Sequence, residues 1–252
     1  DEGGVFQNKR TLDAHTFDYD NASFEEVLVD AGDGVELYAW HITREPAAKT
    51  VLYFGGQGFH LVLAREFVTD MLADVPVNLF LVDYRGYGRS SGEPTVAGLK
   101  QDALAIYDLL TTERGVPPAD LVVHGHSMGS FMASYVAAER PVAGLVLESP
   151  VTEVEGWTKA LVPGLLRVFL KFDIQPELAA ESNTQRVGTI TAPTLMMVGS
   201  EDPITPQALA EELHAASAAG DKRLVVIEGG NHNDLPSFDV FVDAYASYVT
   251  GL

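Results

Sequence analysis

The chain has 252 residues, 46% of them hydrophobic, and it contains no cysteine. This length fits one α/β domain or two small ones, and the apolar content disfavours a disordered chain. The 36 acidic residues outnumber the 16 basic ones and give a formal net charge of −20. Such an acidic protein is a poor partner for nucleic acid, because phosphate binding needs a basic face. Without cysteine, disulfides and cysteine catalysis are excluded.

The sequence also argues against stable insertion into a membrane. Its longest apolar candidate, Leu161–Phe172, is shorter than the ~18 residues of a span and contains Pro163, Arg167 and Lys171. We therefore expect a soluble protein that is either cytoplasmic or exported after removal of a leader. The oligomeric state is left open.

Short apolar runs alternate with helical patterns along the chain. Phe24–Asp30 and Val35–His41 flank Asp33-Gly34, which predicts a β-hairpin. The later runs are continuous, as expected for strands that are buried on both faces of a sheet. These strands are Val51–Phe54, Val77–Asp83, Leu121–His124, Gly144–Glu148, Thr194–Gly199 and Leu224–Glu228. The helices predicted between them are Leu63–Ala73, Val96–Thr111, Ser127–Glu139, Pro206–Ala219 and Phe238–Tyr248.

This alternation predicts an α/β fold with a mostly parallel central sheet of about eight strands flanked by helices. The opening hairpin adds antiparallel strands at one edge. The segment Val151–Val187 interrupts the rhythm and is too long for a plain crossover loop. We interpret it as a small helical cap, inserted into one core domain that consists of residues 1–150 and 188–252.

Residues 125–129 read GHSMG and lie directly after a predicted strand. A G-x-S-x-G sequence in this context is typical of a nucleophile elbow. The glycines avoid collisions with the neighbouring strand and helix, and the Ser127 hydroxyl then stands at the top of the sheet. There the helix N-terminus faces developing negative charge. The alternative is a Gly-rich turn in which Ser127 or Ser130 only caps the helix.

A serine hydroxyl needs a base to become a nucleophile. Among the seven histidines, His232 lies in a Gly/Asn-rich loop after the last predicted strand, at the edge where catalytic groups gather in such sheets. His124 and His126 flank Ser127, but we expect both to point away from its hydroxyl.

The base needs an acid that fixes its tautomer. Asp202 follows the strand Thr194–Gly199 in a turn that contains prolines. Glu201 is the competing candidate, and capping of the turn is the alternative role for Asp202. The chain order Ser127, Asp202, His232 is the one expected for this fold class.

Stabilisation of an oxyanion requires backbone N–H groups. One is expected from Met128, the residue after the nucleophile, and the other from the loop after the strand Val51–Phe54. That loop reads Gly55–Gly58 (GGQG), and we expect the Gln57 N–H to be the donor. A phosphate-binding loop is disfavoured, because neither G-x-x-x-x-G-K-[ST] nor G-x-G-x-x-G is present.

With these residues the sequence resembles the α/β-hydrolase superfamily and, more narrowly, the Bem46-like serine hydrolases. The blocks that carry the likeness are VLYFGGQG, LVDYRGYGRSSGEPTVAGLKQDA, HGHSMGS and GSEDPITP…VVIEGGNHND, which frame most of the chain from Val51 onward. Relatives often carry His-Gly where this chain has Gly55-Gly56. The resemblance implies a triad of Ser127, Asp202 and His232, an oxyanion hole from Gln57 and Met128, and no metal or organic cofactor.

We expect a carboxylesterase-like serine hydrolase that acts on a small-molecule ester with a small to medium acyl chain. The same triad would attack a thioester or an amide, and a non-catalytic binding protein on this fold is the alternative from another class. An apolar stripe in the predicted cap would either line an acyl pocket or pack the cap on the body. It consists of Trp157, Leu161, Leu165, Leu166, Val168, Phe169 and Leu170.

Overall fold

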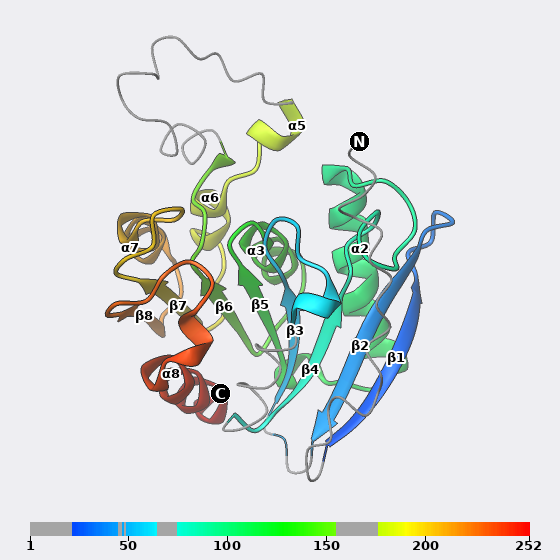
Figure 1. The fold of residues 1–252 in the computed structure, drawn as a ribbon, viewed down its shortest axis with the longest axis horizontal. Helices are drawn as coiled ribbons and strands as arrows, with labels where there is room; N and C mark the ends of the chain where they lie inside the picture. Colours follow the sequence, from blue (N-terminus) through cyan, green and yellow to red (C-terminus); the bar gives the residue numbers. More distant parts are fainter. Residues whose placement is uncertain (1–21, 45–46, 48, 65–74, 155–175) are drawn as a thin grey trace.

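A computed structural model describes residues 22–44, 47, 49–64, 75–154 and 176–252. Its strands form one eight-stranded sheet in the order β1-β2-β4-β3-β5-β6-β7-β8 (Figure 1). The strands are β1 (Ala22–Asp30), β2 (Glu36–Arg44), β3 (Lys49–Phe54), β4 (Val77–Val82), β5 (Leu121–His126), β6 (Gly144–Glu148), β7 (Thr194–Gly199) and β8 (Lys222–Ile227). The β1–β2 and β2–β4 pairs are antiparallel, and the rest of the sheet is parallel. The predicted α/β-hydrolase fold is confirmed.

Helices connect the parallel strands. The longer ones are α2 (Val96–Asp108), α3 (Gly129–Glu139), α7 (Gln207–Ala216) and α8 (Asp239–Gly251). The shorter ones are η3 (Leu61–Ala64), η4 (Leu109–Glu113), η5 (Pro118–Asp120), α5 (Pro176–Ala179), α6 (Asn183–Val187) and η6 (Leu235–Ser237). The helix predicted from Ser127 begins at Gly129 instead, because Ser127 has a φ of +52°, outside the right-handed helical region. The helix predicted over 63–73 lies mostly outside the described residues.

Both faces of the sheet are buried. Leu52 and Phe54 of β3 join a core that includes side chains of α2, α3 and α7, whereas Val51 and Tyr53 join a core on the α8 side. Successive strand residues point to opposite faces, so burial of both faces explains the continuous apolar runs.

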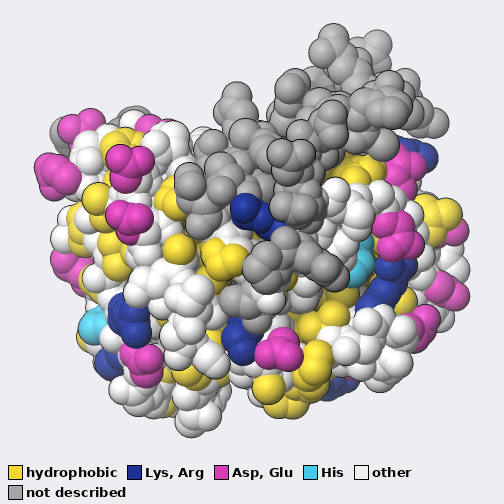
Figure 2. Space-filling view, turned by 90° about the horizontal axis from the view of Figure 1, so that it is seen from below, with side chains coloured by type: hydrophobic (Ala, Val, Ile, Leu, Met, Phe, Trp, Pro, Cys, Tyr) yellow, Lys and Arg dark blue, Asp and Glu magenta, His cyan; other side chains and the backbone are white. Residues whose placement is uncertain are grey.

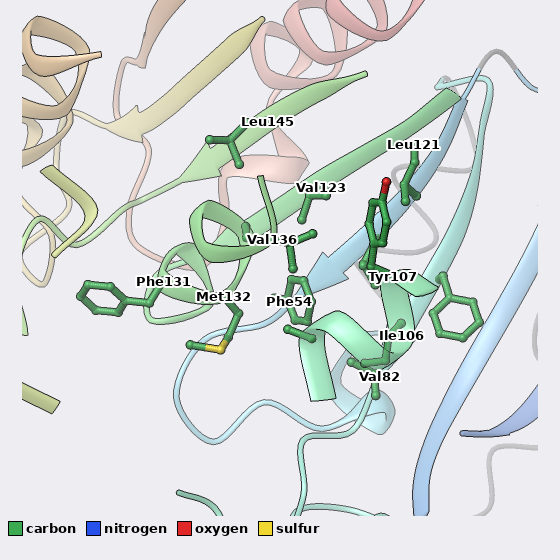
Figure 3. Close-up of a cluster of buried hydrophobic side chains, with 14 of the residues drawn as sticks. Phe54, Val82, Ile106, Tyr107, Leu121, Val123, Phe131, Met132, Val136 and Leu145 are labelled. Atoms are coloured by element: carbon green, nitrogen blue, oxygen red, sulfur yellow. The ribbon is translucent and has the colours of Figure 1, made fainter. Parts of the chain in front are cut away.

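In the core beneath α2 and α3, apolar side chains of the two helices pack against apolar side chains of the strands. Figure 3 shows Ile106 and Tyr107 of α2 and Val136 of α3 gathered around Val123 of β5. Because the apolar face of α3 is held on β5, the N-terminus of α3 is held at the carboxyl end of that strand.

The surface reflects the acidic composition. Figure 2 shows Asp and Glu side chains gathered toward the left and right of one face. Within the described ranges, no helix is long and apolar enough to cross a membrane.

The predicted cap over 151–187 lies largely outside the described residues, which omit 155–175. The division into this cap and a core of residues 1–150 and 188–252 therefore stays a prediction. The structure does describe the two ends of the segment. A β-bridge joins Glu153 to Ser182, and the Ser182 Oγ donates to Glu153 Oε1 at 3.2 Å.

A buried ion pair fastens the loop after β4 to α2. The Arg85 Nε and Nη2 atoms donate to the two carboxylate oxygens of Asp102 at 2.7 and 2.6 Å. The Arg85 Nη1 atom also donates to Asp33 at 3.1 Å, next to the β1–β2 turn. The bidentate geometry of the Arg85–Asp102 pair is the strongest arrangement for an arginine and a carboxylate.

We expect Asp102→Ala to lower the free energy of unfolding by about 3 kcal/mol, because it leaves a buried guanidinium without its main partner. Urea unfolding measures the change. The matched control is Asp108→Ala at the C-terminal end of α2, where the pair with Arg140 is partly exposed. We expect that control to cost less than about 1 kcal/mol. Equal losses in the two variants would contradict this account.

Candidate active site

Ser127 occupies the turn between β5 and α3. It is buried, with 5% of its surface exposed, and its φ of +52° is strained for a residue with a side chain. Its N–H donates to the Glu148 carbonyl at 2.9 Å, which ties the turn to the end of β6. The strained backbone is therefore held by the sheet itself.

The glycines on either side of Ser127 are required by close approaches between backbones. A Cβ on Gly125 would lie 2.4 Å from the Gly129 carbonyl oxygen. A Cβ on Gly129 would lie 2.0 Å from the Phe54 carbonyl oxygen at the end of β3. Backbone atoms cannot move aside as a flexible side chain can, so the turn has no room for a larger residue at either position.

The structure brings Ser127, Asp202 and His232 together from the ends of three strands. The His232 Nε2 atom lies 3.0 Å from Ser127 Oγ, and the His232 Nδ1 atom lies 2.8 Å from Asp202 Oδ2. All three residues are buried, whereas Glu201 is exposed. Of the two neighbouring carboxylates, Asp202 is therefore the one in contact with the histidine.

Asp202 is held in place by its own turn. Its Oδ1 atom accepts the N–H groups of Ile204 and Thr205, each at 2.8 Å, and its Oδ2 atom accepts the Thr205 hydroxyl at 2.7 Å. Burial raises the pKa of this carboxyl, but the hydrogen bonds from His232 and Thr205 outweigh burial and lower it to about 2. The ionised carboxylate accepts from His232 Nδ1–H, which leaves Nε2 as an acceptor facing Ser127.

Gln57 and Met128, the two predicted oxyanion-hole residues, lie close to Ser127 in the chain or in space: Met128 follows Ser127, and Gln57 follows Gly56, where an added Cβ would lie 3.2 Å from the Ser127 Cβ. Both line one cavity of about 100 Å³. Within the described part of the chain, the N–H groups of Gln57 and Met128 donate to no protein acceptor. Two N–H groups thus stand beside the serine with their hydrogen-bonding capacity unused.

The loop that carries Gln57 is fastened at both ends by the residues that follow β4. The Tyr84 hydroxyl donates to the Gly55 carbonyl at 2.7 Å, and the Asp83 Oδ1 atom accepts the Leu61 N–H at 2.7 Å. Asp83 and Tyr84 are the first two residues of the DYRGYGRSSGEP block. Its first residues position this glycine-rich loop.

The rest of the cavity is mostly apolar. Leu99 of α2 and Phe131 and Met132 of α3 form part of its wall. One carboxylate also lines it, that of Glu181, which forms ion pairs with Lys100 and Arg186. The residues of the apolar stripe between 157 and 170 lie outside the described residues.

Three further contacts were not predicted from the sequence. The Ser130 Oγ donates to the Ser127 carbonyl at 2.5 Å, and the Asn183 Nδ2 atom donates to that Ser130 Oγ at 2.8 Å. His126 was expected only to point away from the serine hydroxyl, yet its Nε2 atom lies 2.9 Å from the His232 carbonyl oxygen. No local sequence pattern indicates the contacts of Asn183 and His126, because their partners lie 53 and 106 residues away.

Comparisons with known proteins identify the family. A family model described as "Serine aminopeptidase, S33" matches residues 45–182 and 178–235, which is more than half of the chain. The chain belongs to this family of α/β hydrolases. The described residues of this hydrolase contain no group of three or more His, Asp or Glu side chains that could hold a metal ion.

Its relatives include proteins from distant organisms. The hydrolase is 34% identical over 229 residues to an uncharacterised protein of Mycobacterium tuberculosis, with 89% of this chain and 79% of that protein covered. It is 28% identical to the alpha/beta hydrolase domain-containing protein 17B of Homo sapiens, with 90% of this chain and 76% of that protein covered. The predicted superfamily is thereby confirmed, and the narrower Bem46-like resemblance is consistent with these relatives.

Solved structures share the fold. An acetyl xylan esterase from Paenibacillus sp. R4 aligns with a TM-score of 0.73 at 15% identity, covering 93% of this chain and 86% of that one. An esterase from Pyrococcus furiosus aligns with a TM-score of 0.65 at 20% identity, covering 91% of each chain. At these identities the likeness concerns the fold alone.

The close approach at the elbow predicts an unequal response to two glycine substitutions. Gly129→Ala places a methyl group against the Phe54 carbonyl and is expected to lower the free energy of unfolding by about 3 kcal/mol or more. Gly220→Ala, with nothing within 4 Å of the added carbon, is expected to change it by less than about 1 kcal/mol. Thermal and urea unfolding of both variants check this, and a fully stable Gly129→Ala protein would contradict the geometry.

Proposed function

We propose that this hydrolase cleaves carboxylic esters with a small to medium acyl chain through an acyl-enzyme on Ser127. The observation that carries the proposal is the pair of contacts at His232, 3.0 Å from Ser127 Oγ and 2.8 Å from Asp202 Oδ2. A nucleophile within reach of a base, and a base held by an acid, are the parts that such chemistry needs.

In the first half-reaction, Ser127 Oγ attacks the ester carbonyl while His232 Nε2 takes its proton. Asp202 stabilises the imidazolium that forms. When the tetrahedral intermediate collapses, the bond to the alcohol oxygen breaks, and His232 returns the proton to that oxygen. The alcohol leaves and the acyl group stays on the serine.

In the second half-reaction, water attacks the acyl carbonyl and His232 takes a proton from the water. The serine oxygen then leaves and regains a proton from His232, which releases the carboxylic acid. In both halves the negative oxygen would be held by the N–H groups of Gln57 and Met128. Their unused hydrogen-bonding capacity supports this role.

The cavity beside the serine supports an apolar acyl group. Its volume is about 100 Å³, and its described wall is mostly apolar. Glu181 is paired with two cations and leaves the wall without an unpaired negative charge. The net charge of −20 supports a neutral small molecule over nucleic acid or a strongly anionic ester.

An amide is the second candidate substrate. The family model that matches the chain carries the description of a serine aminopeptidase, and the same attack on an amide releases an amine instead of an alcohol. A thioester remains open for the same chemical reason. A binding protein without catalysis is the alternative from another class, and it would not react at Ser127 with a serine-directed phosphonate.

A p-nitrophenyl ester series from acetate to palmitate tests the proposal. We expect Ser127→Ala to lower kcat on the order of 10³-fold or more, and Asp202→Asn on the order of 10⁴-fold because the histidine then takes the wrong tautomer. The matched control is Glu201→Gln, the exposed neighbouring carboxylate, which should keep wild-type turnover. The best substrate should carry a short to medium chain.

Undiminished turnover by purified Ser127→Ala protein would refute the acyl-enzyme. If the wild type hydrolyses amides but no ester, the substrate class is wrong and the nucleophile stands. If it neither hydrolyses any of these substrates nor labels with phosphonate, the binding-protein alternative replaces the proposal.

A further inference from the structure

Two histidines, a glutamate and a tyrosine gather on the α8 side of the sheet, next to His232. We call His124, His126, Glu148 and Tyr245 the imidazole–carboxylate cluster. His124 and His126 are two residues apart on β5, and His126 is the register partner of Glu148 on β6. Residues in these positions share one face of a sheet, here the face that α8 covers. The His232 loop leads into η6 and α8 on the same side.

The His124 ring lies against Glu148, Tyr245 and Tyr53. The His124 Nε2 atom lies 3.0 Å from Glu148 Oε2, and the His124 Nδ1 atom lies 3.2 Å from the Tyr245 hydroxyl. The Tyr53 ring packs edge-on against the His124 ring, with 4.9 Å between centroids.

Glu148 brings a buried negative charge to the cluster. Burial raises the pKa of its carboxyl, but the nearby imidazoles of His126, His124 and His232 outweigh burial and leave it below the usual range. The backbone carbonyl of the same residue accepts the Ser127 N–H at 2.9 Å. Glu148 thus connects the cluster to the serine as well as to the histidines.

His126 joins this cluster to the loop that carries His232. Its Nε2 atom lies 2.9 Å from the His232 carbonyl oxygen, and the two rings lie 5.1 Å apart. A carbonyl only accepts, so Nε2 carries the proton. Burial lowers the pKa of His126, which keeps the ring neutral with its single N–H on that atom.

The other side of the His232 backbone is held by the loop itself. The His232 N–H donates to Asn231 Oδ1 at 3.0 Å, and the Asn231 N–H donates to Asp234 Oδ1 at 2.6 Å. Both of these partners are on exposed residues. The bond from His126 differs because it anchors the loop to a buried strand.

We propose that His126 is a positioning residue for the reaction. Its bond to the His232 carbonyl holds that backbone so that His232 Nε2 stays within reach of Ser127 Oγ. The inference rests on the proposed function, since it assigns His232 as the base. The His126 ring also packs against the Gly56 backbone, where an added Cβ would lie 3.1 Å from His126 Nδ1. A variant that keeps a ring without the donor therefore separates the bond to His232 from this packing.

The experiment compares substitutions of His126 that differ in one property. Gln carries an N–H donor at the position of the imidazole Nε2. Phe keeps a ring but has no donor. Asn has a donor, but its side chain is too short to reach the His232 carbonyl. His214→Phe on α7 is the matched control for loss of a histidine outside the site. Steady-state kinetics on the best p-nitrophenyl ester and thermal unfolding are measured for each.

We expect His126→Phe and His126→Asn to lower kcat about 10-fold or more with KM changed less than about twofold, because a small displacement of the base slows proton transfer. His126→Gln should keep kcat within about threefold, at a melting temperature like that of the Asn variant. His214→Phe should match the wild type.

Two results would overturn the inference. One is a kcat within threefold of wild type for both Phe and Asn. The other is a Gln variant as slow as the Phe variant, which would mean that the histidine acts by something other than its donor. Ser127→Ala is measured alongside to separate a failure of this inference from a failure of the proposed function. If Ser127→Ala keeps its turnover, the proposed function itself is rejected. If the Phe variant does not fold, the Asn and Gln comparison still decides.

Discussion

The close approach between the β5–α3 turn and the end of β3 is the constraint on which the rest of the site depends. A carbon added at Gly129 would lie 2.0 Å from the Phe54 carbonyl oxygen, so α3 starts with its backbone against the strand. This contact forces the left-handed conformation of Ser127 and directs its hydroxyl to the strand ends, where the loop after β3 also begins. One steric condition therefore sets the positions of the serine and of the amides beside it.

Hydrogen bonds then fix the groups of the site whose positions this close approach does not determine. Glu148 and Tyr84, each from another strand end or loop, hold the Ser127 amide and the Gly55 carbonyl, and Thr205 holds the Asp202 carboxylate from within the same turn. These partners are mostly buried, where a hydrogen bond is electrostatically stronger and its loss leaves an unpaired group. Preorganisation of this kind is what a site for charged intermediates requires, since no reorientation of dipoles is then needed during the reaction.

Much of the fold followed from the sequence because its signals are local. Continuous β-branched runs predicted the strands, and the GHSMG stretch after one of them predicted the sharp turn. Chain order and loop composition were enough to choose Asp202 and His232, which the structure brings into contact. The roles of His126 and Asn183 could not be predicted, because they depend on which face of the sheet a residue occupies and on partners far away in the sequence. His126 was judged by its nearness to Ser127 in sequence, although its place on the α8 face decides what it touches. Asn183 gives no signal, because a buried asparagine is recognisable only once its partners surround it.

The Asn183 contact has a consequence for recombination between members of this family. Its side chain reaches Ser130, whose hydroxyl holds the Ser127 carbonyl, and it also donates to the Val151 carbonyl at 2.6 Å. Residues from Ser182 onward therefore support the turn that carries Ser127, although the predicted cap includes them up to Val187. A chimera that exchanges the predicted cap should keep the native chain from Ser182 onward. A graft that replaces Asn183 as well would remove a support of the serine together with the cap.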